Sequence, residues 1–492
     1  MSLLSLKSGT DIRGTAVGKD AVLTDEAVRK ITCGFLRYLS EKTGLEPGAM
    51  TICVGNDSRI SADRIKRAVC GVLQAGGARV YDCGLASTPA MFMTTVETEA
   101  TAAVQITASH HPYDKNGLKF FTRAGGFEGD EITTVLEYAE QVEDVPCAAF
   151  PHPLRSNFME RYAHILRDKI ISAVEAEDRK HPLAGFHIVV DAGNGAGGFY
   201  ERVLASLGAD TAGSQFLEPD GMFPNHIPNP ENETAMSFIC DAVKRNRADL
   251  GIIFDTDVDR AACVGPDGEE INRNALIALA SVIALEGHPG GTIVTDSVTS
   301  DGLKDFIETH LGGVHYRYKR GYKNVINKAI ELNGQGVDCP LAIETSGHAA
   351  LRENYFLDDG AYLMTKIVIL AANLRKEGKT LTSLLSALRR PAEEKEKRYT
   401  ITLADFRPYG EKVIAELEQY CQQFDYLTPA DDNREGFRVA FDKDHGDGWL
   451  LLRMSVHDPV LPLNIESNSQ GGVAKIEAFF DKFISQYDDL QA

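Results

Sequence analysis

"MTICVGNDSRISADRIKRAVCGVLQAGGARVYDCG", residues 50–84, is the stretch that predicts the fold class. Residues 50–55 are a short apolar strand that ends in the polar loop 56–59. The amphipathic segment 60–77 has helical periodicity and stops at a glycine pair, and residues 78–84 form a second apolar strand. A helix between two apolar strands is a crossover unit, in which the strands are most often parallel. We therefore expect an α/β fold.

Similar patterns recur on the C-terminal side of this unit. The apolar run 102–106 predicts a further strand of the same sheet. Strand, glycine loop and helix start follow one another from residue 185, and a comparable unit begins at residue 290. A long apolar helix is expected around residues 361–374. These repeats predict three α/β units of similar architecture.

The pattern changes after residue 388. The charged segment "RRPAEEKEKR", residues 389–398, contains a proline and is predicted to be a linker. Alternating stretches near 398–403, 437–442 and 448–454, with two helical patterns, predict a smaller antiparallel α+β domain. The expected domains are residues 1–153, 154–266, 267–388 and 395–492.

Composition narrows the classes of partner. Lys and Arg number 51 and Asp and Glu 71, so the net charge is −20 and the general field repels nucleic acids and acidic membranes. Nine dispersed cysteines without a CxxC pair predict reduced thiols. No basic-then-apolar leader and no apolar run of roughly 18 residues is present. We expect a cytoplasmic protein that binds neither nucleic acid nor membrane, and any bound anion needs a local cluster of cations.

Three carboxylates follow the apolar strand 248–254. In "FDTDVDR", residues 254–260, Asp255, Asp257 and Asp259 can converge on one hard cation. Mg²⁺ prefers such oxygen ligands and can keep one position for a phosphate oxygen, which Arg260 would also suit. A calcium EF-hand is a poor match, because Arg260 stands where that motif needs glycine and Pro266 stands where it needs a bidentate glutamate. The alternative is an acidic loop solvated at a strand end.

A polar loop follows the strand 102–106. "TASHHPYDKNGLKF", residues 107–120, holds Ser109, two histidines and two lysines, Lys115 and Lys119. It lacks the G-x-S-x-G of a nucleophile elbow, and a histidine next to a serine in sequence does not make a triad. Pro112 and Gly117 predict an irregular loop, and the lysines and histidines are expected to give it cationic character. A nucleophilic Ser109 and a turn-forming Ser109 both remain open.

Two further loops carry polar side chains that suit a sugar. In "IETSGH", residues 343–348, Glu344 and Ser346 can bind vicinal hydroxyls, and His348 can transfer protons near neutral pH. Lys323, in "GYKN", lies near a predicted helix start. The alternative for the first loop is a polar turn with a hydrogen-bonded histidine.

A phosphate cradle is predicted after the strand in "GWLLLRMSVHDP", residues 448–459. It comprises Arg453, Ser455 and His457, because a guanidinium with hydroxyl and backbone N–H groups suits a phosphate. Together the loops describe one kind of site, for a divalent metal, a phosphate and sugar hydroxyls.

The order of these motifs resembles the α-D-phosphohexomutases, the phosphoglucomutase/phosphomannomutase superfamily. "SGTDIRG" (8–14) is similar to the N-terminal signature, "TASHHPYDKNGLKF" to the phosphoserine loop and "DTDVDR" (255–260) to the metal loop. "IETSGH" is similar to the sugar-binding loop and "LRMSVHDP" (452–459) to the phosphate-binding loop. The resemblance implies three similar α/β/α domains with mixed sheets and a smaller C-terminal α+β domain, arranged around a central cleft.

The resemblance also implies an activity. It is the interconversion of hexose 1-phosphate and hexose 6-phosphate, with glucose or mannose as the sugar, through a phosphoserine and a hexose 1,6-bisphosphate that also acts as activator. Ser109 would carry the phosphoryl group, and Mg²⁺ would bind Ser109, Asp255, Asp257 and Asp259. The remaining implied roles are proton transfer and charge stabilisation (Arg13, Lys119 and His348) and substrate binding (Lys323, Glu344, Ser346, Arg453, Ser455 and His457). The expected partners are small sugar phosphates, and the expected state is a monomer or homodimer.

Departures from the family pattern include His111, which is expected to change how the phosphoserine loop is held, and residues 456–458, the largest departure, which leaves phosphate affinity and substrate choice open. His111 replaces the usual asparagine, and Val456-His457-Asp458 replace Gly-Thr-Glu, which makes the backbone less permissive and removes a hydroxyl donor. Three alternatives also stay open: a phosphoglucosamine mutase, a Mg²⁺-dependent phosphatase with Asp255 as nucleophile, and an inactive sugar-phosphate sensor.

Overall fold

The computed structural model describes residues 2–149, 151–455 and 458–491. The chain divides into two compact units. The first contains residues 1–276 and 346–384, and the second contains residues 277–345 and 385–492. Among the described residues, no helix combines the length and the apolar character that a bilayer crossing requires.

The first unit begins with a mixed sheet in which the predicted crossover is confirmed. β3 (Thr51–Asn56) runs parallel to both β4 (Arg79–Leu85) and β5 (Ala102–Ile106), and α2 (Ala62–Ala75) connects β3 to β4. The strand order is β1-β2-β6-β5-β3-β4-β8, with β7 beside β6. The other strands are β1 (Lys7–Ser8), β2 (Asp11–Thr15), β6 (Lys115–Thr122), β7 (Gly125–Gly126) and β8 (Leu154–Arg155).

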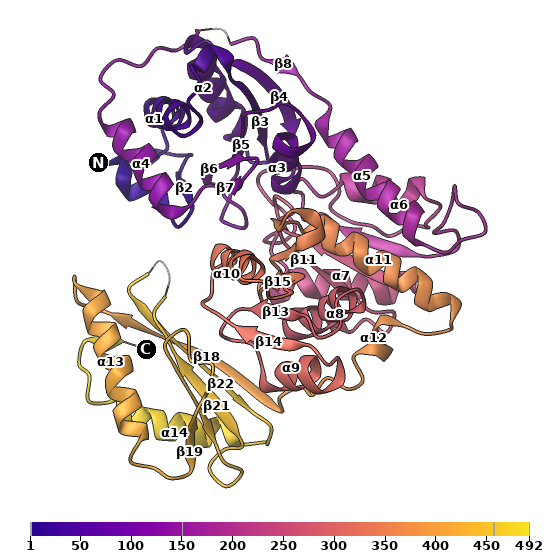
Figure 1. Ribbon diagram of the computed structural model, residues 1–492, viewed down its shortest axis with the longest axis vertical. Coiled ribbons are helices and arrows are strands. Elements are labelled where there is room, and N and C mark those ends of the chain that lie inside the picture. Colours follow the sequence, from indigo (N-terminus) through magenta and orange to yellow (C-terminus); the bar gives the residue numbers. More distant parts are fainter. Residues whose placement is uncertain (1, 150, 456–457, 492) are drawn as a thin grey trace. The chain divides into compact units, whose positions relative to one another are not determined.

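Helices cover both faces of this sheet (Figure 1). On one side α1 (Asp25–Thr43) packs with α2 and α4 (Gly129–Glu140), and on the other side α3 (Thr88–Glu97) packs on β5. Helix α1 has strong end signals: the Thr24 side chain accepts from the Ala27 N–H, and Gly44 closes the helix in the left-handed region. Short 3-10 turns are Leu3–Leu6, Pro47–Ala49 and Arg352–Asn354.

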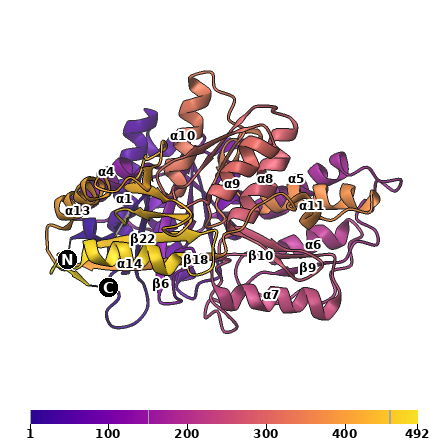
Figure 2. The ribbon, with the colours of Figure 1, turned by 90° about the horizontal axis from the view of Figure 1, so that it is seen from below.

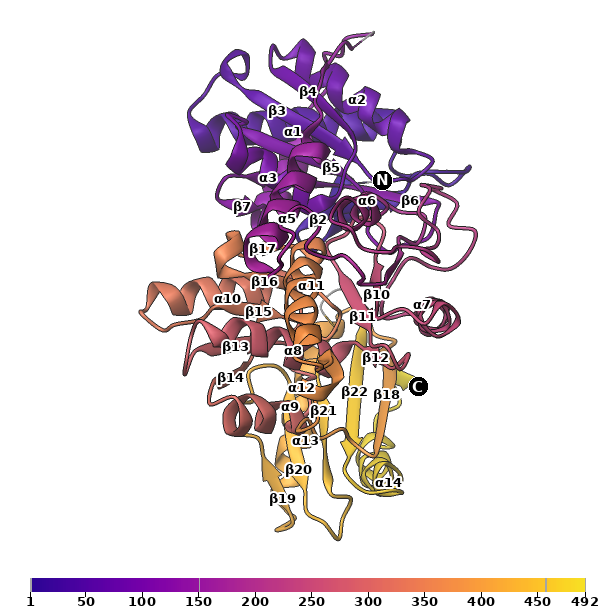
Figure 3. The same ribbon diagram turned by 90° about the vertical axis from the view of Figure 1, so that its right-hand side faces the viewer.

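A second mixed sheet carries the acidic loop. Its order is β12-β11-β10-β9, with β9 (Ile188–Asp191) parallel to β10 (Leu250–Phe254) and β11 (Ala261–Val264) antiparallel to β10. Helices α7 (Glu233–Asn246) and α11 (Gly360–Lys376) lie on opposite sides of β10 and β11 (Figure 3). The remaining elements are β12 (Glu270–Ile271), α5 (Phe158–Ala173), α6 (Phe199–Ser206), β16 (Ala349–Leu351), β17 (Leu357–Asp358) and α12 (Leu381–Leu384).

The second unit contains a parallel group of strands. β13 (Thr292–Thr295) lies between β14 (Val314–Arg317) and β15 (Leu341–Ile343). Polar loops leave the carboxyl ends of all three strands, which meet at one edge because the strands are parallel. The helical segments are α8 (Arg273–Glu286), α9 (Asp301–Asp305), the π-helical turn Phe306–His310 and α10 (Tyr322–Gly334).

An antiparallel sheet with two helices follows in the same unit, which confirms the predicted α+β character of this part. The strand order is β19-β20-β21-β22-β18-β23. α14 (Gly472–Ile484) lies along β22 and β18 (Figure 2), and α13 (Phe406–Cys421) contributes to the same core. The strands are β18 (Glu393–Ile401), β19 (Leu427–Pro429), β20 (Phe437–Phe441), β21 (Gly448–Leu452), β22 (Val460–Ser467) and β23 (Leu490–Gln491).

The predicted linker at residues 389–398 is wrong over most of its length. β18 begins at Glu393 and pairs with β22 from Glu393 to Thr400. Its charged side chains find partners on α14, since Lys395 and Lys397 contact Glu477 at 2.7 and 3.5 Å. Only Tyr399 and Ile401 are buried, so the strand shows almost no apolar alternation in sequence.

Candidate active site

The three aspartates of the acidic loop lie together in the turn between β10 and β11. All three are buried, and one oxygen of each carboxylate lies within 4.8 Å of the others. Val258, between Asp257 and Asp259, has φ 68°, a strained conformation for a β-branched residue. Burial and the two neighbouring carboxylates raise the pKa of Asp255 well above its usual value. The backbone is therefore strained where the carboxylates converge.

The loop fits a divalent cation. Asp257 Oδ1 and Asp259 Oδ1 are buried and have no hydrogen-bond partner among the described residues. A buried carboxylate oxygen without a partner is costly, and a hard cation is the ligand that would compensate it. Asp255, Asp257 and Asp259 are thus the residues that can hold Mg²⁺.

Cationic side chains surround these carboxylates. Lys119, on β6, places Nζ 2.6 Å from Asp259 Oδ2 and 3.2 Å from Asp257 Oδ2. Arg260 Nη2 lies 3.0 Å from Asp255 Oδ2. Burial favours a raised pKa for Asp259, but Lys119 and other cations outweigh it and hold this pKa far below its usual value. Asp259 is consequently ionised.

Ser109 lies beside the acidic loop. Its Oγ donates to Asp255 Oδ2 at 3.2 Å and accepts from Arg260 Nη2 at 3.1 Å. The side chain is buried, and the backbone has φ 52°, an uncommon conformation for serine. Two loops that are 146 residues apart in sequence therefore meet at one hydroxyl, one carboxylate and one guanidinium.

Arg59 holds the Ser109 loop in place. Its guanidinium donates to the carbonyls of Ser109 and His111 at 2.5 and 2.6 Å, and to those of Pro112 and Lys115 at 2.6 and 2.9 Å. Asp57 pairs with Arg59 Nε at 3.1 Å. Sequence reasoning treated residues 56–59 only as a polar loop. The available signal was that they follow β3, the parallel neighbour of the strand that precedes Ser109.

The two adjacent histidines do not supply positive charge, contrary to the prediction. His110 Nδ1 accepts from Arg260 Nη2 at 2.6 Å, and burial together with Arg260 lowers the pKa of His110 far below its usual value. Burial and Arg13 lower the pKa of His111 to about 4. The rings stack with centroids 4.9 Å apart. Both histidines are therefore neutral at pH 7, and the cations of this region are lysines and arginines.

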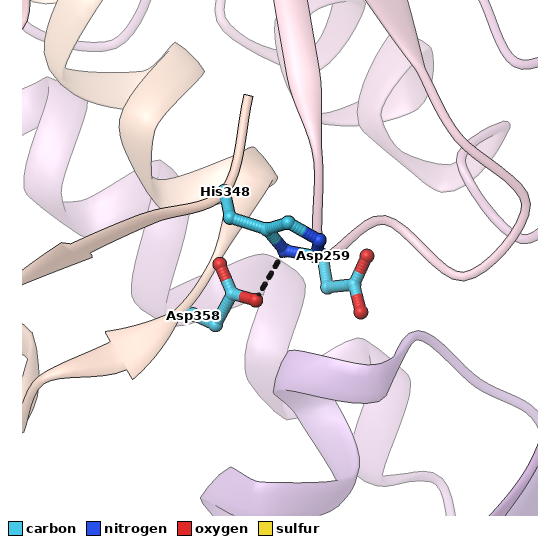
Figure 4. Close-up of side chains that lie close together, drawn as sticks. All are labelled: Asp259, His348 and Asp358. Carbon is cyan, nitrogen blue, oxygen red and sulfur yellow. Dashed lines mark hydrogen bonds and ion pairs between the residues drawn. The ribbon is translucent and has the colours of Figure 1, made fainter. Parts of the chain in front are cut away.

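His348 has a carboxylate partner that the sequence analysis missed. Asp358 Oδ2 lies 2.5 Å from His348 Nδ1, and Asp358 Oδ1 accepts from the Ala349 N–H at 3.0 Å. Figure 4 shows Asp358 at the Nδ1 edge of the ring and Asp259 beyond the ring. Burial opposes protonation, but Asp358 and Asp259 raise the pKa of His348 to about 9. Asp358 stands ten residues from His348, so only the β16–β17 pairing reveals it.

Arg13 and Ser346 also belong to the first unit. Arg13, on β2, lies opposite Gly117 of β6, and its Nη2 contacts Asp11 Oδ2 at 2.7 Å. Ser346 is buried two residues before His348. The first unit thus contains all the predicted catalytic and metal-binding residues: Arg13, Ser109, Lys119, Asp255, Asp257, Asp259 and His348.

The other predicted substrate-binding residues lie in the second unit. Glu344 Oε1 accepts from the Gly321 N–H at 2.6 Å, and Lys323 is in the first turn of α10. Arg453 is buried directly after β21, and Ser455 Oγ accepts from the Asp458 N–H at 3.3 Å. The predicted His457 lies outside the described residues. These positions remain predicted substrate contacts.

Family models match most of the chain. They are phosphoglucomutase/phosphomannomutase, alpha/beta/alpha domain I at residues 6–144, domain II at 160–268 and domain III at 272–391. The chain belongs to the α-D-phosphohexomutase superfamily. It is accordingly a mutase, an enzyme of the isomerase class, with three α/β/α domains and a fourth, sheet-rich C-terminal domain.

Relatives of this phosphohexomutase cover nearly its whole length. A phosphoglucomutase of Neisseria gonorrhoeae is 29% identical over 98% of this chain and 96% of its own. A phosphomannomutase/phosphoglucomutase of Pseudomonas syringae is 29% identical over 87% and 86%. A crystal structure of a phosphoglucomutase/phosphomannomutase family protein from Burkholderia thailandensis matches with TM-score 0.80 and 25% identity, covering 99% of this chain and 98% of that one.

Proposed function

We propose that this phosphohexomutase interconverts hexose 1-phosphate and hexose 6-phosphate, with glucose or mannose as the sugar, through phosphorylated Ser109. The observation that carries the proposal is the contact of Ser109 Oγ with Asp255 and Arg260 of the acidic loop. Membership of a mutase family does not favour the phosphoglucosamine, phosphatase or sensor alternatives.

The reaction transfers one phosphoryl group at a time. The bond between phosphorus and Ser109 Oγ breaks as a bond forms to the free hydroxyl of the sugar phosphate, which gives a hexose 1,6-bisphosphate. Return of the other phosphoryl group to Ser109 releases the isomer. Asp255, Asp257 and Asp259 would hold Mg²⁺ together with phosphorylated Ser109. When bound, that ion would neutralise charge on the phosphoryl oxygens.

Side chains of the protein supply proton transfer and positive charge. His348 donates Nδ1–H to Asp358, so Nε2 is the atom left for proton transfer. Because a pKa of about 9 keeps the ring protonated at pH 7, Nε2 gives a proton to a substrate oxygen and later recovers it, and the positive ring stabilises negative charge. Lys119 and Arg260 pair with carboxylates of the acidic loop and supply positive charge there, and Arg260 also donates to Ser109 Oγ. Arg13 lies close enough to lower the pKa values of His110 and His111, so its positive charge adds to those of Lys119 and Arg260.

Substrate recognition is assigned to the remaining predicted residues. Glu344 and Ser346 would bind sugar hydroxyls, and Lys323, Arg453 and Ser455 would bind the phosphate that is not reacting, with His457 as a further donor. One such set can accept a sugar phosphate in two orientations, because the vicinal hydroxyls look alike from either direction. We propose hexose 1,6-bisphosphate as both the intermediate and the activator of this reaction.

The test measures turnover of glucose, mannose and glucosamine 1-phosphates with Mg²⁺ and the matching bisphosphate. We expect formation of 6-phosphates from glucose or mannose, and loss of turnover in Ser109→Ala. Ser281→Ala is the matched control, because among the described residues the one hydrogen bond of this buried hydroxyl is to the Ile277 carbonyl within α8. Full turnover by Ser109→Ala would contradict the proposal, and a preference for glucosamine 1-phosphate would reassign the sugar.

A further inference from the structure

A loop of the C-terminal sheet contacts the loops that follow β13 and β14. This segment, residues 430–436 between β19 and β20, is named the clamp loop here. Glu435 Oε2 accepts from Ser297 Oγ at 2.5 Å and from the Arg320 backbone N–H at 3.1 Å. Arg434 Nη1 donates to the Arg317 carbonyl at 3.1 Å. All of these residues belong to the second unit.

The peptide after Arg320 connects this contact to the predicted sugar loop. The Gly321 N–H donates to Glu344 Oε1 at 2.6 Å, so two carboxylates hold two consecutive N–H groups. Gly321 has φ 115°, a conformation that favours glycine, and no side chain caps α10 at this position. The position of Glu344 is therefore tied to the 318–321 segment, and that segment is tied to Glu435.

Ser297, which donates to Glu435, is held by hydrogen bonds from Arg438. Arg438, on β20, donates to the carbonyls of Ser297 and Thr299 at 3.2 and 2.9 Å and to Asp301 at 2.8 Å. Its guanidinium stacks on Trp449 at 3.5 Å from the ring centroid. Ser297 and the clamp loop are thus fixed from the same strand, so the donor and the acceptor keep their separation.

Glu435 also lies in the field of the predicted phosphate-binding arginine. Burial lowers the pKa of Arg453, and the negative charge of Glu435 opposes this shift. The geometry gives Glu435 two separable properties. One is a hydrogen-bond acceptor for Arg320 N–H and Ser297, and the other is a negative charge near Arg453.

We propose that Glu435 is a positioning residue that aligns the 318–321 segment, and through Gly321 the sugar-binding Glu344, by accepting hydrogen bonds. It sets the affinity for the sugar phosphate, and it leaves phosphoryl transfer at Ser109 unchanged. This role rests on the proposed function insofar as Glu344 binds the sugar.

Three variants separate the acceptor from the charge. Glu435→Ala removes both, whereas Glu435→Gln keeps an acceptor oxygen. Asp431→Asn is the matched control, because Asp431 lies in the same loop and its side chain is exposed. Among the described residues its closest ion pair is with Lys304, at 3.3 Å. We expect Glu435→Ala to raise KM for hexose 1-phosphate about tenfold with kcat within about twofold, and Glu435→Gln and Asp431→Asn to stay within about twofold of wild type in both constants. Equal KM increases in Glu435→Gln and Glu435→Ala, or no increase in either, would overturn the proposal.

Amide hydrogen exchange tests the same proposal without any turnover. In the wild-type chain the Arg320 and Gly321 amides are expected to exchange slowly, and Glu435→Ala should accelerate both at least about tenfold while Glu435→Gln does not. Unchanged exchange in Glu435→Ala would overturn the positioning role. A wild-type protein without mutase activity but with the expected exchange pattern would instead overturn the proposed function alone.

Discussion

Arg59 is the residue on which the geometry of the Ser109 loop depends most. Its guanidinium reaches four carbonyls of that loop and pairs with buried Asp57. Lysine has one compact ammonium and cannot reproduce this fork. We predict that Arg59→Lys lowers the free energy of unfolding by about 3 kcal/mol and kcat by at least about tenfold.

Denaturant unfolding and steady-state kinetics measure the two effects of Arg59→Lys. Arg161→Lys is the control, because the Arg161 side chain is largely exposed and pairs with Glu97 at 2.7 Å, and an exposed ion pair contributes about 0–1 kcal/mol. If Arg59→Lys retained wild-type kcat and stability, the loop would not depend on Arg59.

Asp358 acts through His348 rather than on the substrate. An asparagine at this position can still accept from the Ala349 N–H, but it no longer offers a carboxylate to His348 Nδ1. We predict that Asp358→Asn lowers kcat about ten- to a hundredfold and leaves KM within about twofold, as measured by initial rates. An increase in KM with kcat unchanged would assign Asp358 to substrate binding instead.

At the scale of elements, α11 begins directly against the acidic loop, residues 254–260. The Gly360 N–H donates to the Val258 carbonyl at 3.1 Å, and a Cβ on Gly360 would lie 2.8 Å from the Arg260 carbonyl carbon and 2.9 Å from the Val258 oxygen. These are backbone atoms of the strained turn, so they cannot move without displacing Asp257 or Asp259. Only glycine lets the helix start this close.

Gly360→Ala tests this close approach. We predict a loss of about 1–3 kcal/mol in the free energy of unfolding and weaker stabilisation by Mg²⁺ in thermal unfolding. Gly287→Ala is the control, since a Cβ there meets no atom within 4 Å. Unchanged Mg²⁺ stabilisation in Gly360→Ala would show that the helix start does not position the aspartates.

Elements with regular apolar periodicity were predictable from sequence, and contacts between distant loops were not. Residues 50–84 have strong helical periodicity between two apolar strands, the segment 361–374 is a long apolar run, and α2 and α11 match these two patterns. β18 was missed because its charged side chains are satisfied by α14, which no local pattern reveals. The site shows the same division. Ser109 and the three aspartates stand in recognisable motifs. Arg59 and Glu435 act through backbone groups, and Asp358 acts through the ring of His348, ten residues away in sequence.

At the scale of the whole molecule, one buried carboxyl makes stability depend on pH. Glu466, on β22, accepts from Trp449 Nε1 at 3.0 Å, and burial raises its pKa from 4.5 to about 7. Between these pH values the folded state keeps a proton that the unfolded state releases. Stability is therefore highest below pH 4.5 for this group, and it falls as pH rises to 7, by about 1.4 kcal/mol per pH unit.

Glu466→Gln removes this dependence. We predict that the free energy of unfolding of the variant, minus that of the wild type, increases between pH 5 and 7 by an amount on the order of 2–3 kcal/mol and then stays constant. Denaturant unfolding at pH 5, 6, 7 and 8 gives the difference. A difference that does not change with pH would place the Glu466 pKa at its ordinary value in the folded state.

The central claim is that Ser109 is the phosphoryl carrier of this phosphohexomutase, positioned by contacts with Asp255 and Arg260. The most direct measurement is the intact mass of the protein and of its peptides after incubation with hexose 1,6-bisphosphate and Mg²⁺. The account predicts a gain of one phosphoryl group, located on Ser109, absent from Ser109→Ala and discharged by hexose 1-phosphate. A phosphoryl group on Asp255, or none on Ser109 while turnover proceeds, would contradict it.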